Sequence, residues 1–288
     1  MSGTDREIAV PASNGVAAAS PAADERRDTR RAVRRWAKTV TPPIVFAVLV
    51  LVSWEVFVYL TAINALLLPA PSQIGVSLAD NAGLFAKNAV VTLGEILIGF
   101  ALGAFVGVAL GILLSYSRVF ERSVYPWLVA SQMVPIVAVA PILVVWFGFT
   151  LVPKVLVVAL ISFFPVVVNT VDGLQSVDRQ MINLMRTLGA SRVKTMRTVR
   201  IPWAMPFVFS GLKIAMALAV VGAVFGEWVG SNAGLGYLML AFNNQLATTD
   251  LFAAVIVLSA MGIALFFLVG GVERLVIPWH HDKRQGGR

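Results

Sequence analysis

Three carboxylate side chains fall in or near long apolar segments of the chain: Glu55, Glu95 and Glu227. An acid inside a bilayer is costly, and such residues commonly serve ion or proton pathways. A relay of these groups would let a carrier couple solute movement to the proton gradient, which is one functional hypothesis. Glu95 and Glu227 lie near the ends of their apolar segments, where we expect water to reach them, whereas Glu55 lies deeper.

Other chemistry has little support in the residues. The sequence has no cysteine, and its two histidines, His280 and His281, stand together near the C-terminus with no third ligand nearby. Neither a G-x-S-x-G nucleophile turn nor a G-x-x-x-x-G-K-[ST] phosphate loop occurs. We therefore expect no enzyme activity, no bound metal and no cofactor. If ATP drives the protein, another subunit must hydrolyse it.

A polar, basic interruption at residues 178–206 separates two apolar segments. Its first half places apolar residues on one helical face, and Gly189 then supplies a permissive stop. That face consists of Met181, Leu184, Met185 and Leu188. Ser191 can cap a second, basic helix, which Pro202 ends because proline lacks the amide that the helix would use next. Such a hairpin either lies on the lipid headgroups, apolar side down, or serves as a docking handle for a partner.

The order of residues in this hairpin resembles the EAA loop of permease subunits of bacterial binding-protein-dependent ABC importers. That pattern runs Glu-Ala-Ala, three residues, Gly, nine residues, Ile, one residue, Leu, Pro. The matching positions here hold Gly189, Val199, Ile201 and Pro202. The positions of the Glu-Ala-Ala triplet hold Asn183, Leu184 and Met185 instead.

The resemblance implies that cytoplasmic ABC ATPase subunits grip this loop. The residues that it implicates are Met185, Arg186, Leu188, Gly189, Ala190, Ser191, Arg192, Val193, Met196 and Pro202. It further implies two ATPases that bind the ATP, an extracytoplasmic solute-binding protein and two permease copies, most simply a homodimer.

Two further strings extend the resemblance. Residues 227–237 read EWVGSNAGLGY, and residues 68–72 read Leu-Pro-Ala-Pro-Ser. Both are similar to permeases of the nitrate, sulfonate and taurine type, and the first also to thiamine-precursor and riboflavin relatives. The resemblance implies a small solute such as sulfonate, taurine or nitrate, with a pyrimidine thiamine precursor or riboflavin as the alternative.

Composition places the elements that carry these motifs in a membrane. Of 288 residues, 58% are hydrophobic and only 13% are charged. A bilayer core of about 30 Å needs roughly 20 apolar residues per helix. Six segments qualify, at residues 43–62, 89–115, 123–147, 153–171, 207–229 and 251–275. We therefore predict an all-α polytopic protein with six transmembrane helices, and the resemblance implies the type I ABC importer permease fold.

The net charge is +8, and the basic residues are distributed according to the predicted membrane topology, which argues against a nucleic-acid partner. With the N-terminus inside, all but three of the 23 Lys and Arg residues fall in segments on the inner side. The exceptions are Lys87 and Lys154 outside and Lys213 near the inner end of the fifth span. We expect a multi-pass protein of the bacterial inner membrane, with both termini cytoplasmic and the basic charge facing anionic lipid or a cytoplasmic partner.

The chain divides into four parts. We predict a disordered basic cytoplasmic tail at residues 1–42, then the first span and an external linker at residues 43–88, with an amphipathic segment at 73–88. The transmembrane core occupies residues 89–275 and includes the coupling loop at 172–206. Residues 276–288 form a cytoplasmic C-terminal tail.

Small residues and prolines mark the helix contacts. Span two carries Gly99, Gly103, Gly107 and Gly111. Span five carries Gly211, Ala215, Ala219 and Ala223 at the same spacing. Each stripe predicts a closely approaching neighbour helix. The prolines of span three free backbone carbonyls, so Gln132, Met133 and Pro135 are candidates to line a solute path, with simple kinking as the alternative.

Overall fold

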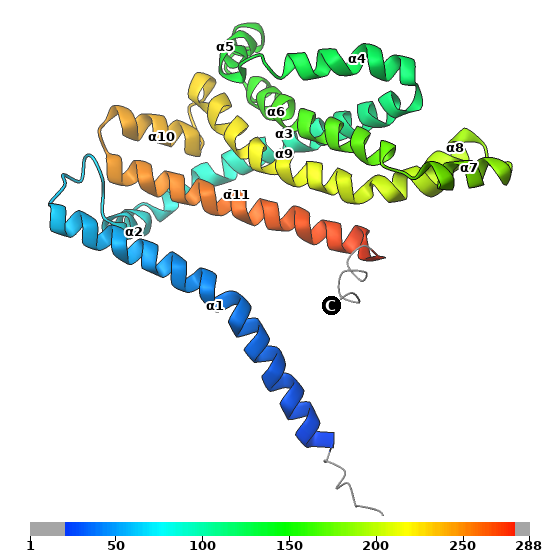
Figure 1. The fold of residues 1–288 in the computed structure, drawn as a ribbon. Coiled ribbons are helices and arrows are strands. Elements are labelled where there is room, and N and C mark those ends of the chain that lie inside the picture. The colour runs from blue at the N-terminus through cyan, green and yellow to red at the C-terminus, as the bar shows by residue number, and fades with distance from the viewer. Residues whose placement is uncertain (1–20, 280–288) are drawn as a thin grey trace, which may run out of the picture. The chain divides into compact units, whose positions relative to one another are not determined.

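The computed structural model describes residues 21–279, and within them every regular element is helical (Figure 1). The prediction of an all-α protein is confirmed. The elements are α1 (Pro21–Thr61), α2 (Pro71–Asp80), α3 (Ala82–Tyr116), α4 (Arg118–Ser131), α5 (Ile136–Phe147), α6 (Leu151–Gln175), α7 (Arg179–Thr187), α8 (Arg192–Thr195), a π-turn (Met196–Arg200), α9 (Ile201–Gly230), α10 (Leu235–Asn244) and α11 (Thr248–Val276).

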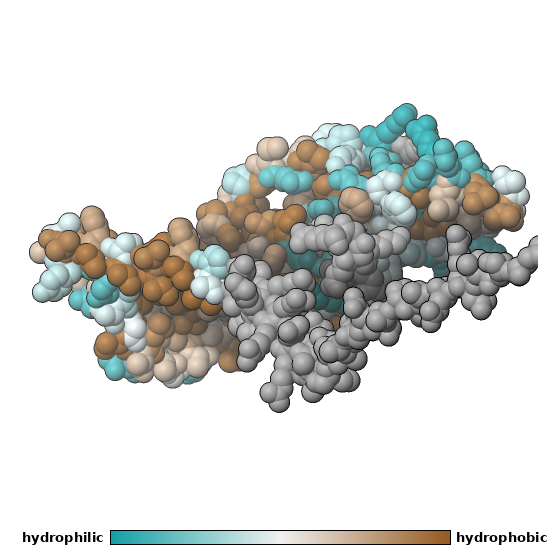
Figure 2. Space-filling view, turned by 60° about the horizontal axis from the view of Figure 1, so that its bottom comes forward, coloured by the Kyte–Doolittle hydropathy of each residue, from teal (hydrophilic) through white to brown (hydrophobic). Residues whose placement is uncertain are grey.

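Five helical stretches in the described part are long and apolar enough to cross a membrane. They are Thr41–Thr61, Ala82–Tyr116, Leu151–Gln175, Arg192–Gly230 and Thr248–Val276. The bent pair α4–α5 supplies a sixth when it is counted as one span. Much of the visible face in Figure 2 is hydrophobic, as lipid contact requires.

The first helix forms a unit of its own in the chain and begins earlier than predicted. It runs through residues 21–42, for which the sequence predicts a disordered tail. The sequence there is rich in Ala and Arg, which are strong helix formers, and it leads directly into an apolar span. Residues 1–20, and His280 and His281 at the other end, lie outside the described residues.

The third span is not one helix. The predicted segment 123–147 consists of α4 and α5, which meet at an angle of 92°. Pro135 forms the start of α5, where its missing amide costs nothing, and it pushes the residue before it out of the helical region. Gln132, Met133 and Pro135 are all exposed in this bend. The prolines therefore break the span rather than merely kink it.

The glycine stripe on α3 faces α6. A Cβ atom built on Gly103 would lie 2.5 Å from the carbonyl oxygen of Ala159, and one on Gly107 would lie 2.9 Å from Cβ of Val166. Gly99 and Gly111 meet Val158 and Thr170 in the same way. The prediction of a close neighbour helix is confirmed, and that neighbour is α6.

A matched pair of alanine substitutions tests this contact. Gly103→Ala should destabilise the folded protein by about 1–3 kcal/mol, because the added methyl group collides with the α6 backbone. Gly94→Ala has open space within 4 Å of the added atom, so it should be neutral or slightly stabilising. Unfolding in mixed detergent micelles would measure both. Equal stability of the two variants would contradict close packing at Gly103.

α9 lies against another side of α6. A Cβ atom on Gly211 would lie 2.9 Å from the carbonyl oxygen of Pro165, and one on Gly222 would lie 3.2 Å from Cα of Val158. Ala215, Ala219 and Ala223 on the same helix are fully buried. The second predicted stripe thus also marks a helix contact, and α3 and α9 both pack against α6.

Polar contacts connect α2 and α9 to α11. The hydroxyl of Ser77 on α2 donates to Asp250 on α11 at 2.5 Å, and Lys213 on α9 forms an ion pair with Glu273 on α11. The predicted amphipathic segment 73–88 is not continuous, because the chain breaks at Asn81 between α2 and α3. These contacts place α2 and α9 against the last helix.

Candidate functional site

The hairpin between α6 and α9 is built from local signals. Asp178 caps α7, since its carboxylate accepts a hydrogen bond from the amide of Gln180 at 2.8 Å. Gly189 follows α7 with φ 70°. Its amide donates to the carbonyl of Arg186, and that of Ala190 donates to Met185, both at 2.9 Å. This is the Schellman arrangement, in which a left-handed residue ends the helix, and the prediction that Gly189 stops the first helix of the hairpin is confirmed.

The second half of the hairpin departs from the prediction. Ser191 caps α8 by accepting from the amide of Lys194 at 3.2 Å, as expected. However, Pro202 does not end the helix. A π-turn follows α8, the amide of Ile201 donates back to Met196, and α9 continues to Gly230. Pro202 lies in the first turn of α9, where a missing amide is tolerated.

The apolar face of α7 has no cover within the described chain. The exposed fractions of Met181, Leu184 and Leu188 are 42%, 53% and 71%, and no residue of α7 is buried. Sequence analysis found this face by its periodicity, and the resemblance implied that ATPase subunits grip the loop that carries it. Figure 2 shows polar residues gathered toward the end of the view where Figure 1 places α7 and α8.

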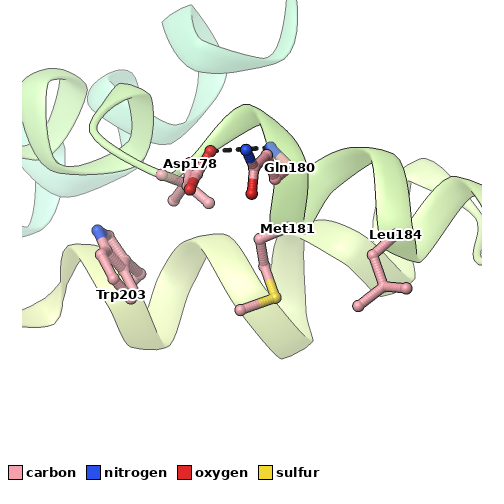
Figure 3. Close-up of a pocket in the computed structure, with 6 residues that line it drawn as sticks. Asp178, Gln180, Met181, Leu184 and Trp203 are labelled. Atoms are coloured by element: carbon pink, nitrogen blue, oxygen red, sulfur yellow. Dashed lines mark hydrogen bonds between the residues drawn. The ribbon is translucent and has the colours of Figure 1, made fainter.

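A pocket of about 440 Å³ adjoins this face. The side chains of Met181 and Leu184 extend from α7, and Trp203 of α9 lies across from them (Figure 3). The remaining lining residues are Val177, Asp178 and Gln180. Trp203 was not predicted as a site residue, although an aromatic residue directly after Pro202 at the end of a polar loop could have indicated it. The pocket can accept an apolar side chain from outside.

The predicted loop residues serve different roles. Leu188, Ser191 and Val193 are exposed, and Met185 is half-buried. Met196 is buried in a cluster with Leu174 and Ala204, so it attaches the hairpin to the bundle rather than facing outward. The exposed basic residues of the hairpin are Arg179, Arg186, Arg192, Lys194 and Arg197. The bend with Gln132, Met133 and Pro135 belongs to α4–α5 and contributes nothing to the pocket.

Two of the three acids lie in a buried polar cluster, and the expectation that water reaches them is wrong. Glu95 and Glu227 are each 1% exposed. Glu95 forms an ion pair with Lys154 of α6. Glu227 accepts hydrogen bonds from Thr92 at 2.6 Å and from the amide of Gly236 at 2.5 Å. Because α3 begins at Ala82, Glu95 lies more than three helical turns from its start.

The remaining acid, Glu55, is half-buried within the stretch Thr41–Thr61 of α1. Glu95 and Glu227 have partners that explain how they tolerate burial, because buried charges require pairing or several donors. Among residues 21–279, no three His, Cys, Asp or Glu side chains are grouped as a metal site would need.

Comparison with known proteins assigns these features to one family. Residues 99–280 match the family described as the inner membrane component of binding-protein-dependent transport systems. The chain is 40% identical over 238 residues to the formylaminopyrimidine transport permease protein of Halalkalibacterium halodurans, covering 82% of this chain and 95% of that one. It is 30% identical over 249 residues to a putative aliphatic sulfonates transport permease protein of Bacillus subtilis, covering 86% and 89%.

A solved structure shares the fold. The methionine ABC transporter MetNI in an inward-facing conformation aligns with a TM-score of 0.59 at 18% identity, over 69% of this chain and 97% of that one. The expected ABC importer permease fold is confirmed.

Proposed function

The chain belongs to the inner membrane component family of binding-protein-dependent transport systems, and from that premise we propose that the α7–α8 hairpin couples it to a separate cytoplasmic ATPase. It is a multi-pass inner membrane permease of the ABC importer class. The observation that carries the proposal is the exposed apolar face of α7 beside the Trp203 pocket. An exposed apolar patch rimmed by polar residues is typical of a protein interface.

The charge of the hairpin supports a cytoplasmic position. Arg186, Arg192, Lys194 and Arg197 are exposed on it, and positive charge favours the inner side of the membrane. Both chain termini then lie in the cytoplasm. We propose that an apolar side chain of the ATPase enters the pocket, while acidic groups around it meet the basic residues.

The proposed assembly contains two copies of this permease, two ATPases that bind and hydrolyse ATP, and an external solute-binding protein. Closure of the ATPases would move the hairpins, and α9 would rotate with them because it continues from α8 without a break. Rotation about the small-residue contacts with α6 would alternate the open side of the path. Gln132, Met133 and Pro135 remain candidates to line that path.

For the solute we propose a pyrimidine of the formylaminopyrimidine kind or riboflavin, ahead of a sulfonate, taurine or nitrate. The support is the higher identity to the formylaminopyrimidine and riboflavin permeases, 40% and 38%, against 30% for the sulfonate relative. Competition between these compounds for uptake would decide the class.

Two substitutions at Gly189 test the docking role. No atom lies within 4 Å of a Cβ added there, so only the backbone at φ 70° opposes a side chain. Gly189→Val should cost about 1–2 kcal/mol of hairpin stability and reduce ATPase capture by roughly 5- to 30-fold. Gly189→Asn should capture the ATPase nearly normally, because asparagine tolerates this conformation.

The measurement is the amount of ATPase that co-purifies with each variant after membrane insertion has been verified. Capture by Gly189→Val equal to that of the unaltered protein would refute docking at the hairpin. A loss of both variants from the membrane would show instead that Gly189 serves folding.

A further inference from the structure

Every backbone amide in the first turn of α10 has a hydrogen-bond partner, and these partners are side chains of two other helices. Backbone N–H groups at the start of a helix lack partners within it and need them from elsewhere when buried. Here the amide of Gly234 donates to Asn88 at 2.7 Å and that of Leu235 to Thr92 at 2.8 Å. The amides of Gly236 and Tyr237 both donate to Glu227, at 2.5 and 3.1 Å. α10 is thus held by side chains of α3 and α9.

Glycine is needed at two positions of this turn because the backbone there lies very close to Glu227. Gly234 has φ 114°, and a Cβ atom on it would collide with the carboxylate of Glu227. A Cβ atom on Gly236 would lie 2.9 Å from Oε2 of Glu227 and 3.0 Å from Cα of Val224. The string Gly-Leu-Gly-Tyr therefore leaves room for the side chain of Glu227, seven residues before its first glycine.

α6 completes this cluster. Lys154 forms an ion pair with Glu95 of α3, and its ammonium donates to the hydroxyl of Ser231 at 3.1 Å, in the connection from α9 to α10. Thr92 and Glu227 are 0% and 1% exposed. Because water does not reach these groups, each lost contact would leave a buried polar atom without a partner.

α9 joins this cluster to the hairpin. Trp203 of the pocket and Glu227 lie on the same uninterrupted helix. At 1.5 Å per residue they are about 36 Å apart along its axis. Figure 1 shows the two regions at opposite ends of the bundle, with α7 and α8 at one end and α10 at the other.

We propose that α9 carries the movement of the hairpin to α10, and that Asn88, Thr92 and Glu227 form a latch that makes α10 move as one body with α3 and α9. This inference rests on the proposed coupling of the hairpin to an ATPase. It assigns these three residues a positioning role in transport, whereas a loosely attached α10 would act as an independent lid.

The absence of cysteine in the chain allows single spin labels to test the latch. One label is placed by Lys87→Cys, exposed near the start of α3, and another, in a separate sample, by Asn244→Cys, exposed at the last residue of α10. In the complex with its ATPase, each sample reports the distance between the two permease copies with ADP and with ATP plus vanadate. We expect both distances to change with nucleotide in the unaltered latch.

Thr92→Val then removes the hydroxyl at nearly constant shape, and Thr92→Ser keeps it. Loss of the partner of Leu235 should raise the detached population of α10 by about 5- to 150-fold. In Thr92→Val the distance between the two labels at position 87 should still change with nucleotide. The distribution of distances between the two labels at position 244 should broaden and no longer depend on nucleotide. In Thr92→Ser both should follow.

Other outcomes overturn the proposal in distinguishable ways. An Asn244 distance that still follows in Thr92→Val would show that the latch does not carry the movement. Distances that stay constant at both sites without Thr92 substitution would refute the hairpin coupling as well. If Thr92→Val does not fold, a protein that carries both Lys87→Cys and Asn244→Cys provides the test. The distance between these two labels within one copy must be the same in both nucleotide states. A change in this distance would mean that α10 is an independent lid.

Discussion

Lys154→Met should destabilise the protein by about 3–5 kcal/mol, because it leaves the carboxylate of Glu95 buried without a counter-charge. Lys154 and Glu95 are 11% and 1% exposed in their side chains, so water cannot replace the lost partner. Ser231 also loses the ammonium that donates to it. Equilibrium unfolding in mixed detergent micelles would measure the effect.

The double variant Glu95→Leu with Lys154→Met is the control. It removes both charges together, and such replacements are often neutral or stabilising. We expect it to recover most of the stability that the single variant loses. Equal destabilisation by the single and double variants would mean that packing volume, rather than the ion pair, accounts for the loss.

Inactivation of the partner ATPase should reduce solute uptake to background even when the proton gradient is intact. The physical reason is that this chain holds no phosphate-binding loop, so the proposed energy source lies entirely on the other subunit. The assay uses vesicles with binding protein outside and ATP inside, with and without a protonophore. A formylaminopyrimidine serves as the solute.

The proton-coupled carrier predicts the opposite pattern in the same assay. Under the importer proposal, Glu55→Gln should keep most of the uptake, with any loss explained by folding. Uptake that persists without ATP, disappears with the protonophore and is lost in Glu55→Gln would favour the carrier.

Local signals predicted the helices and the hairpin well. The spacing of Met181, Leu184 and Leu188 indicated the exposed face of α7, and Gly189 indicated its end. The stripe through Gly103 predicted a close helix contact, because glycine at every fourth position lets the backbone of a neighbouring helix approach closely. These features depend on residues within one helix, which is why periodicity finds them.

Features that depend on distant residues were not predicted. Glu227 is surrounded by donors from α3 and from the chain beyond α9, and no periodic pattern encodes that meeting. Pro202 alone predicts a helix end, whereas the preceding π-turn lets the helix continue past it. The angle of 92° at Pro135 likewise depends on what α5 packs against, including Val157 of α6.

The π-turn at Met196–Arg200 has a consequence for how sequence length is constrained. Successive residues of an α-helix are rotated by about 100°, so one residue more or less in this turn would change the phase of everything before it relative to α9. The apolar face of α7 and the side of α9 that carries Trp203 line one pocket, and such a change would rotate one of them away from the other. Insertions are tolerated in many loops, but here the number of residues sets the rotational orientation of the hairpin relative to α9, so an insertion or deletion should disrupt the pocket.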